Sequence, residues 1–218
     1  MLTPNAGKNL LENDKQINYN IISRFLPKKN FKIISNFTHK NLAQLLSKNE
    51  IIAVVRGREE FGARALGNRS IIANPSNYSA VKRINESIKN RDFWMPFALT
   101  ILKKDHKKFI KNIKNFRCDF MTMTFDTNKN NLEKIHAGCH PYDHTVRPQI
   151  LEKKFNPMYY SIIKKFYAFT GIPALLNTSL NLHGYPVASS LKDVIFTFKN
   201  SELKFLYIND NFLITKNY

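Results

Sequence analysis

The stretch IIAVVRGREEFGARALGNRS, residues 51–70, predicts the centre of the fold. Its first five residues are apolar, which is typical of a buried strand. The fifteen residues that follow contain four arginines, three glycines and two adjacent glutamates. Glycine lets backbone N–H groups approach an anion closely, and arginine binds phosphate oxygens in pairs. The stretch therefore predicts a strand that leads into a phosphate-binding loop; the alternative is a solvated loop with surface salt bridges.

Length and composition are those of a globular protein. The chain has 218 residues, of which 43% are hydrophobic, enough for a substantial core. No apolar run approaches the roughly 20 residues that cross a bilayer. Residues 1–8 lack the apolar segment of a signal peptide, so we expect a cytoplasmic protein. Cys118 and Cys139 do not indicate a disulfide framework.

The net charge of +18 raises the question of anionic partners. Lysine is spread along the whole chain, which is typical of general surface charge. Arginine is concentrated instead: six of the nine arginines lie between residues 56 and 91, namely Arg56, Arg58, Arg64, Arg69, Arg83 and Arg91. This clustering favours a small phosphorylated ligand over a nucleic-acid groove, and we expect no membrane partner.

Strand and helix patterns alternate along the chain. Residues 1–30 are polar and predict an extension, and residues 31–218 predict one domain. Strands are expected at 31–34, 51–55, 70–73, up to residue 102, and at 119–125, 173–176, 205–208 and 212–214. Helices are expected from Thr38, at 78–89, over the lysine-rich stretch 103–115, from Asn156 and from Ser190. The alternation predicts an α/β fold with a mixed sheet flanked by helices.

Three of the helices carry capping signals. Thr38 precedes one, and Ser190 with Asp193 resembles a capping box before another. The best marked helix has Asn156 as N-cap, Pro157 at its first position and Gly171 at its exit. We expect its buried face to consist of Met158, Ile162, Phe166 and Phe169.

Two further segments carry candidate site chemistry. Residues 177–184 place amides, hydroxyls and a glycine directly after a predicted strand, which indicates either a ligand-binding loop or an Asx/Ser-Thr turn. A second segment holds the soft donors His136, Cys139, His140 and His144. Without a paired C-x-x-C unit they are weak evidence for zinc, so we predict no metal site. We prefer residues 140–149 as a turn that presents Asp143, Thr145 and Arg147.

Four blocks, in order, resemble one known family. They are G-R-x-E-F-G-x-R-A-L-G-N-R-S at 57–70, N-x-x-x-K-x-R-D-x-W-x-P-F-A at 85–98, H-P-x-D-x-T-x-R-P-Q at 140–149 and L-N-T-S-L-N-x-x-G-x-P at 176–186. This pattern is similar to the carbamoyltransferase C-terminal domain, the YrdC-like part of the O-carbamoyltransferases of nodulation and antibiotic pathways. The resemblance covers about residues 33–216 and implies a YrdC-like fold.

The resemblance implies a two-part chemistry. The YrdC-like domain forms carbamoyl adenylate from carbamoyl phosphate and ATP, with Mg²⁺, and releases phosphate and pyrophosphate. A larger actin-like N-terminal domain, which binds a metal, then transfers the carbamoyl group to a hydroxyl of a small acceptor. That domain is absent from this sequence, so the resemblance predicts a split subunit, a remnant or a fragment that depends on a separate partner. Arginines suit the first step because two polyanions must be held together.

Motif matching assigns the site residues. The predicted catalytic residues, which contact phosphate oxygens, are Arg58, Arg64, Arg69 and Arg147. The predicted substrate-binding residues are Asn68, Lys89, Arg91, Asn177, Thr178 and Ser179. Met95 stands where the family usually has arginine, which removes one potential contact.

Two alternatives remain open. One is a threonylcarbamoyl-adenylate synthase for tRNA modification, which shares the fold, although the four blocks follow the O-carbamoyltransferase pattern. The other is a catalytically silent module that binds anions or nucleic acid, for which a salt-dependent shift on RNA without any effect of nucleotide would be the sign.

Overall fold

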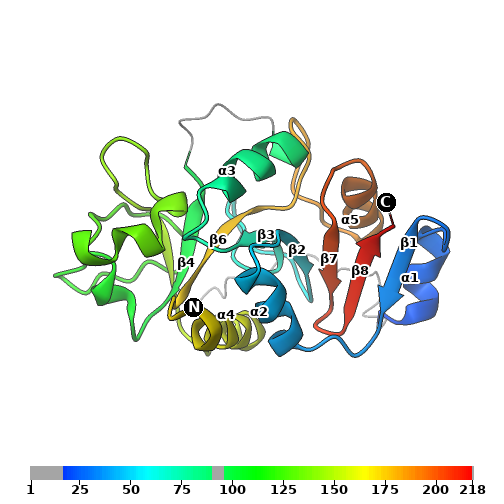
Figure 1. Ribbon diagram of the computed structural model, residues 1–218, viewed down its shortest axis with the longest axis horizontal. Helices are drawn as coiled ribbons and strands as arrows, with labels where there is room; N and C mark the ends of the chain where they lie inside the picture. Colours follow the sequence, from blue (N-terminus) through cyan, green and yellow to red (C-terminus); the bar gives the residue numbers. More distant parts are fainter. Residues whose placement is uncertain (1–16, 90–95, 218) are drawn as a thin grey trace.

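The computed structural model describes residues 17–89 and 96–217. These residues form an eight-stranded mixed sheet in the order β1-β8-β7-β2-β3-β6-β4-β5 (Figure 1). The strands are β1 (Phe31–Ile34), β2 (Ile52–Val55), β3 (Arg69–Ala73), β4 (Ala98–Leu102), β5 (Pro148–Leu151), β6 (Ala174–Ser179), β7 (Phe205–Ile208) and β8 (Phe212–Lys216). The predicted mixed sheet is confirmed.

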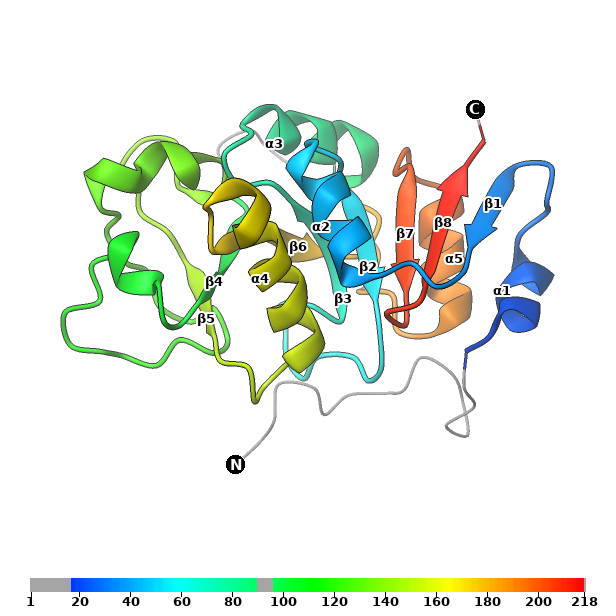
Figure 2. The same ribbon diagram turned by 60° about the horizontal axis from the view of Figure 1, so that its bottom comes forward.

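Five α-helices are found in the described residues. They are α1 (Tyr19–Phe25), α2 (His39–Ser47), α3 (Ser79–Ile84), α4 (Pro157–Thr170) and α5 (Leu191–Lys199). Figures 1 and 2 show α2 and α4 side by side on one face of the sheet, while α5 lies behind β7 and β8 on the other face. The central strands are thus covered on both sides, and every residue of β2 and β3 is buried.

The strand pairing places the arginine-rich loop beside the end of β6. β2 pairs with β3 in antiparallel fashion, so residues 56–68 connect two neighbouring central strands. β3 in turn pairs with β6, and Ser70, the second residue of β3, lies opposite Ser179. Two sequence-distant polar segments therefore meet at one end of the sheet.

The predicted helix caps are confirmed. Thr38 and Asn41 form a capping box on α2, and Ser190 and Asp193 form one on α5. The Asn156 side chain accepts from Tyr159 N at the start of α4, and Gly171 ends this helix with a φ of 69°. Such positive φ values favour glycine.

The buried face of α4 was predicted only in part. Ile162 and Phe166 are fully buried, but Met158 and Phe169 are 45% and 46% exposed. Tyr159 and Ile163 are buried in their place. The face is rotated because it packs on both the sheet and α2.

Residues 103–147, between β4 and β5, form an irregular lobe at one end of the sheet (Figures 1 and 2). Two predictions are wrong here. The lysine-rich stretch 103–115 holds only the short 3₁₀ turn His106–Lys108, and 119–125 is not a strand. Single bridges join Ile110 to Thr127 and Phe125 to Val146. A positive φ of 56° at Met121 interrupts any extended run through this segment.

The segment assigned to an N-terminal extension contributes to the core where it is described. Ile17, Ile22 and Leu26 belong to the main hydrophobic cluster, and α1 carries Ile22 fully buried. The spaced apolar side chains of residues 17–26 therefore pack against the main core although the segment is polar overall.

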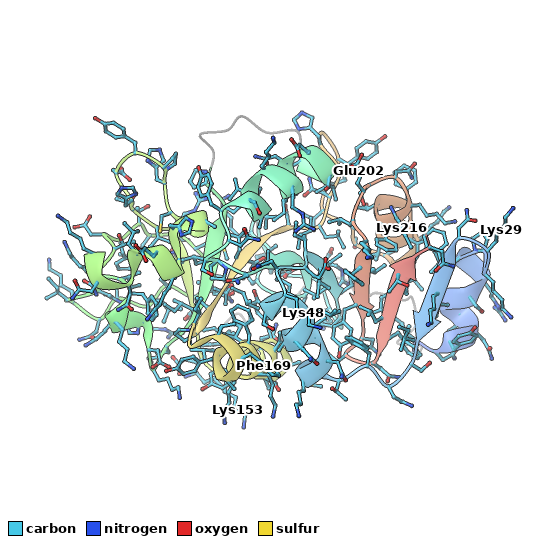
Figure 3. All side chains as sticks on the ribbon, in the orientation of Figure 1. Lys29, Lys48, Lys153, Phe169, Glu202 and Lys216 are labelled. Carbon is cyan, nitrogen blue, oxygen red and sulfur yellow. The ribbon has the colours of Figure 1, made fainter. Side chains whose placement is uncertain are left out.

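Lysine charge is spread over the surface. Figure 3 labels Lys29 before β1, Lys48 after α2, Lys153 between β5 and α4, and Lys216 in β8. Lys29, Lys48 and Lys153 are exposed, as expected for general surface charge, whereas Lys216 is partly buried and its Nζ donates to Ser201 O. Within the described residues, none of the helices has the length and apolar character needed to cross a membrane.

Candidate active site

The arginine-rich loop is held in shape by its own glutamate. One carboxylate oxygen of Glu60, Oε1, accepts hydrogen bonds from the backbone N–H groups of Leu66 (2.7 Å), Asn68 (2.7 Å) and Arg69 (3.1 Å). Sequence reasoning expected such N–H groups to face phosphate and did not assign Glu60. A carboxylate of the chain itself occupies these donors, so the loop is organised around an internal anion.

Arg69 is a buried tie within this loop. Its side chain has no solvent exposure, and burial lowers its pKa to about 10 in spite of the opposing effect of Glu60 and Glu59. Nε donates to Ser189 O, Nη1 to Arg56 O and Asn68 O, and Nη2 to Gly57 O, at 2.7–3.2 Å. Backbone carbonyls thus accept from four of the five guanidinium N–H groups, which gives Arg69 a positioning role in the loop; its contact with phosphate stays a prediction.

Asn68 also holds the loop. Its Nδ2 donates to Arg58 O (2.6 Å), and its Oδ1 accepts from Asn156 Nδ2 (2.9 Å), so the loop is joined to the N-cap of α4. The adjacent Gly67 has a φ of 109°, and a Cβ there would lie 2.2 Å from the Tyr159 ring. These contacts give Asn68 a structural role in the loop, and its role in orienting substrate stays a prediction. The Arg58 side chain is exposed and lies outside the cleft described next.

A cleft of two adjoining cavities opens between the loop, the end of β6 and the lobe. Both cavities are lined by Ala63, Arg64, Met121 and Arg147. The inner cavity, of about 80 Å³, adds Ala65, the segment 96–98 and the end of β6, namely Asn177, Thr178 and Ser179. The outer cavity, of about 380 Å³, adds Leu66 and the aromatic side chains of Phe61 and Phe120. A polar end thus joins a more apolar one.

Arg64 and Arg147 bring two like charges to this cleft. The pKa of Arg147 is lowered, first by burial and then by the nearby positive charge of Arg64. Arg147 Nε is buried without a hydrogen-bond partner, and no ion pair found in the described residues involves either arginine. Guanidinium groups without a negatively charged partner have the charge and donor geometry that suit an anion.

The polar segment predicted as a loop after β6 is partly the strand itself. Asn177, Thr178 and Ser179 are its last three residues and pair with β3. The strand geometry holds their backbone in place, and Asn177 and Thr178 are buried. The structure therefore brings these three predicted residues together with Arg64 and Arg147.

Lys89 contacts this end of β6 from the segment that follows α3. It ends a π-helical turn, Asn85–Lys89, that continues α3, and its side chain is almost fully buried. Its Nζ donates to Asn181 Oδ1 (2.6 Å) and Ser179 Oγ (3.2 Å). Sequence reasoning found Lys89 and Ser179 but left Asn181 without a role. The remaining predicted residue, Arg91, lies outside the described residues.

The donor set of the cleft does not suit a protein-bound Mg²⁺. The ion prefers carboxylate and other oxygen ligands, whereas the described residues that line both cavities include no aspartate or glutamate. Among the described residues, no group of three His, Cys, Asp or Glu side chains is placed to hold a metal ion.

The histidine and cysteine side chains considered for zinc take part in separate local contacts. His136 stacks on Tyr78 with centroids 5.6 Å apart, and His140 pairs with Asp143 at 3.2 Å. Cys139 is buried, and burial raises the pKa of its thiol to about 12, so the thiolate that binds metals is disfavoured.

Comparison with protein families gives a match over most of the chain. The family described as "Carbamoyltransferase C-terminus" matches residues 43–216. This region contains both walls of the cleft and the whole of the sheet except β1.

Three relatives show what the matching proteins are. An uncharacterized protein of Methanocaldococcus jannaschii is 40% identical over 175 residues, 80% of this chain and 33% of that protein. Nodulation protein NolNO of Sinorhizobium fredii is 36% identical, over 80% of this chain and 25% of its own length. The 3'-hydroxymethylcephem-O-carbamoyltransferase of Amycolatopsis lactamdurans is 29% identical, over 79% and 32%. The chain thus spans a quarter to a third of these relatives.

Solved structures share the fold at low sequence identity. Sua5 of P. abyssi complexed with L-threonine has a TM-score of 0.55 at 17% identity, over 82% of this chain and 48% of that one. HypF in a phosphate- and nucleotide-bound form has a TM-score of 0.53 at 14% identity, over 86% and 22%. YciO of E. coli has a TM-score of 0.53 at 15% identity, over 78% and 76%. The predicted YrdC-like fold is confirmed.

Proposed function

Because the chain belongs to the carbamoyltransferase C-terminus family, we propose that it forms carbamoyl adenylate from carbamoyl phosphate and ATP for O-carbamoylation of a small acceptor. The observation that carries the proposal is the pair of uncompensated arginines, Arg64 and Arg147, in one cleft. A site of this charge favours a polyanion. The inner cavity suits a small phosphorylated group, and the outer cavity with its aromatic side chains has room for more of a nucleotide.

The reaction balances with one water. Water takes the phosphoryl group of carbamoyl phosphate, which leaves carbamate and phosphate. A carbamate oxygen then attacks the α-phosphorus of ATP, the bond to the bridging oxygen of the β-phosphate breaks, and pyrophosphate leaves. Arg64 and Arg147 reduce the repulsion between the two anions and stabilise the charge that moves onto the leaving groups. Mg²⁺ enters with ATP as its counter-ion.

The other site residues act around these two. The hydroxyl of Thr178 donates to phosphoryl or carbamoyl oxygens. The hydroxyl of Ser179 donates to Asn181 Oδ1 and accepts from Lys89, so Ser179 shapes the substrate-binding end of β6. Arg69 and Asn68 position the loop that carries Arg64. Arg58 and Arg91 remain predicted phosphate contacts.

We also propose that transfer to the acceptor needs a further region, the actin-like domain of the family. The relatives are three to four times as long as the stretch they share with this chain, which supports a role for such a further region. In this proposal the chain supplies the adenylate-forming part of a cytoplasmic carbamoyltransferase and works with a separate acceptor-binding subunit, without a membrane or nucleic-acid partner.

The test is pyrophosphate release from ATP and Mg²⁺ by the purified chain. We expect release only when carbamoyl phosphate is present, alone or after addition of the product of the adjoining gene. Arg64→Ala is expected to lower carbamoyl phosphate affinity about tenfold or more, since a charge-assisted hydrogen bond is lost. Unchanged affinity in this variant would remove the anion-site assignment, and absence of both binding and release would remove the function.

The likeness to Sua5 complexed with L-threonine supports a second candidate, a threonylcarbamoyl-adenylate synthase. The same assay separates the two. Pyrophosphate release that requires threonine and bicarbonate, and ignores carbamoyl phosphate, favours the synthase.

A further inference from the structure

Asn177 presents a buried acceptor whose orientation is fixed. The residue is 1% exposed and lines the inner cavity. Its Nδ2 donates to Ala65 O (3.0 Å) and to Thr100 Oγ1 (3.1 Å). A backbone carbonyl only accepts hydrogen bonds, so the amide nitrogen must face Ala65 and the flipped orientation is excluded.

A second hydrogen bond behind Asn177 supports this orientation. Thr100 Oγ1 donates its own proton to Gln149 Oε1 at 2.9 Å, so it accepts from Asn177. Both N–H groups of the Asn177 amide are therefore engaged. Its Oδ1 is buried and has no hydrogen-bond partner among the described residues, which is a costly arrangement unless a ligand completes it.

The charged groups of the same cavity have the opposite character. Arg64 and Arg147 are cations, and Arg147 Nε is a buried donor without a partner. A ligand that satisfies the whole cavity must carry an anion for the arginines and, at its other end, an N–H for Asn177. An amide NH₂ attached to a phosphorylated carbonyl has this arrangement.

We infer that Asn177 Oδ1 accepts an N–H of the carbamoyl group and thereby selects carbamoyl phosphate over acyl phosphates without an N–H. This inference rests on the proposed function and adds the atom that sets its specificity. Acetyl phosphate is the closest probe, because a methyl group replaces the NH₂ and the phosphate is unchanged. With acetyl phosphate bound, Asn177 Oδ1 stays buried without a hydrogen-bond partner. A binding site discriminates strongly against a ligand that leaves one of its buried polar groups unpaired.

The first experiment uses the unaltered chain and calorimetry with carbamoyl phosphate, acetyl phosphate and inorganic phosphate. We expect carbamoyl phosphate to bind about tenfold or more tightly than acetyl phosphate. Equal affinity for these two would overturn the inference while leaving the arginine site intact. Failure of all three ligands to bind would overturn the proposed function together with the inference.

The second experiment assigns the preference to Asn177. Asn177→Ala is expected to lower carbamoyl phosphate affinity to about that of acetyl phosphate and to change acetyl phosphate affinity much less. Asn74→Ala is the matched control: Asn74 is also buried at a strand end, bonds to Asn49 and Ser76, and does not line the cleft. It reports the loss of stability from removing a buried amide and should keep the preference. A preference that survives in folded Asn177→Ala would overturn the inference.

Discussion

The two walls of the cleft are built in different ways. The wall formed by residues 56–68 is tied together by Glu60, Asn68 and Arg69, whose polar atoms bond to the loop's own backbone. The opposite wall comes from the irregular lobe, where single bridges join neighbouring segments and Arg147 keeps a buried Nε without a partner. Glu60, Asn68 and Arg69 therefore hold the shape of the loop, whereas the lobe places an unpartnered charge in the cleft.

This contrast separates arginines that look alike in sequence. Arg69 bonds to four backbone carbonyls and supports the fold, while Arg64 and Arg147 face the same space and repel each other. Changes in the loop should act first on stability, and changes at Arg147 should act on binding.

The largest effect is expected from Glu60→Ala. It removes the acceptor of three backbone N–H groups, and we expect the free energy of unfolding to fall by about 2–4 kcal/mol, with carbamoyl phosphate affinity falling as Arg64 loses its support. Chemical denaturation measures the first effect and calorimetry the second. Glu59→Ala, at the adjacent carboxylate that accepts none of these bonds, is the control. Equal stability of the two variants would show that the loop does not depend on Glu60.

A smaller effect, on binding alone, is expected from Arg147→Met. Methionine keeps the apolar stem but removes the charge, so carbamoyl phosphate affinity should fall about 10- to 100-fold. The melting temperature without ligand should stay level or rise, because burial and Arg64 both disfavour this charge. Arg117→Met is the control in the same lobe: it breaks an ion pair with Asp119 at 2.5 Å and should leave affinity unchanged. A marked loss of stability in Arg147→Met would contradict the assignment.

The smallest effect concerns the turn before Arg147. The backbone N–H and hydroxyl of Thr145 donate to Asp143 and lower its pKa below the ordinary 3.8. A depressed carboxyl pKa stabilises the fold above the ordinary value, and this contribution is lost as the pH falls through the lower folded value. Asp143→Asn accepts the same bonds at every pH, so the melting-temperature advantage of the unaltered chain should shrink below about pH 3.8. A constant difference down to pH 2.5 would contradict the prediction.

Much of the sheet and most helix ends could be predicted because their signals are local. Thr38, Asn156 and Ser190 cap the helices that they precede, and the apolar runs at 51–55 and 205–208 contain strands. The lobe could not be predicted in this way. The alternation at 119–125 is that of a strand, yet within residues 17–89 and 96–217 its one pairing is the single bridge from Phe125 to Val146. Alternation without a partner does not make a strand.

Sequence patterns predicted which residues lie near the cleft better than they predicted what each residue contacts. Arginine and asparagine donate equally well to phosphate and to backbone carbonyls, so residue type did not distinguish Arg69 from Arg64. The burial of Arg69 distinguishes the two roles. Arg69 is buried because it begins β3, which pairs with β2, and because the backbone of Ser189 lies within hydrogen-bond distance of its side chain. One sequence feature indicates the role of Glu60: it is a carboxylate placed among arginines in a loop expected to bind anions.

The carboxylate at the centre of the loop also has a consequence for the unliganded protein. A glycine-rich loop that waits for phosphate exchanges its amide protons quickly until the ligand arrives. Here the amides of Leu66, Asn68 and Arg69 already have an acceptor. These three amides should exchange slowly with deuterium before any substrate is added. Substrate binding should then change the environment of the side chains in the cleft but not the exchange rates of these backbone amides.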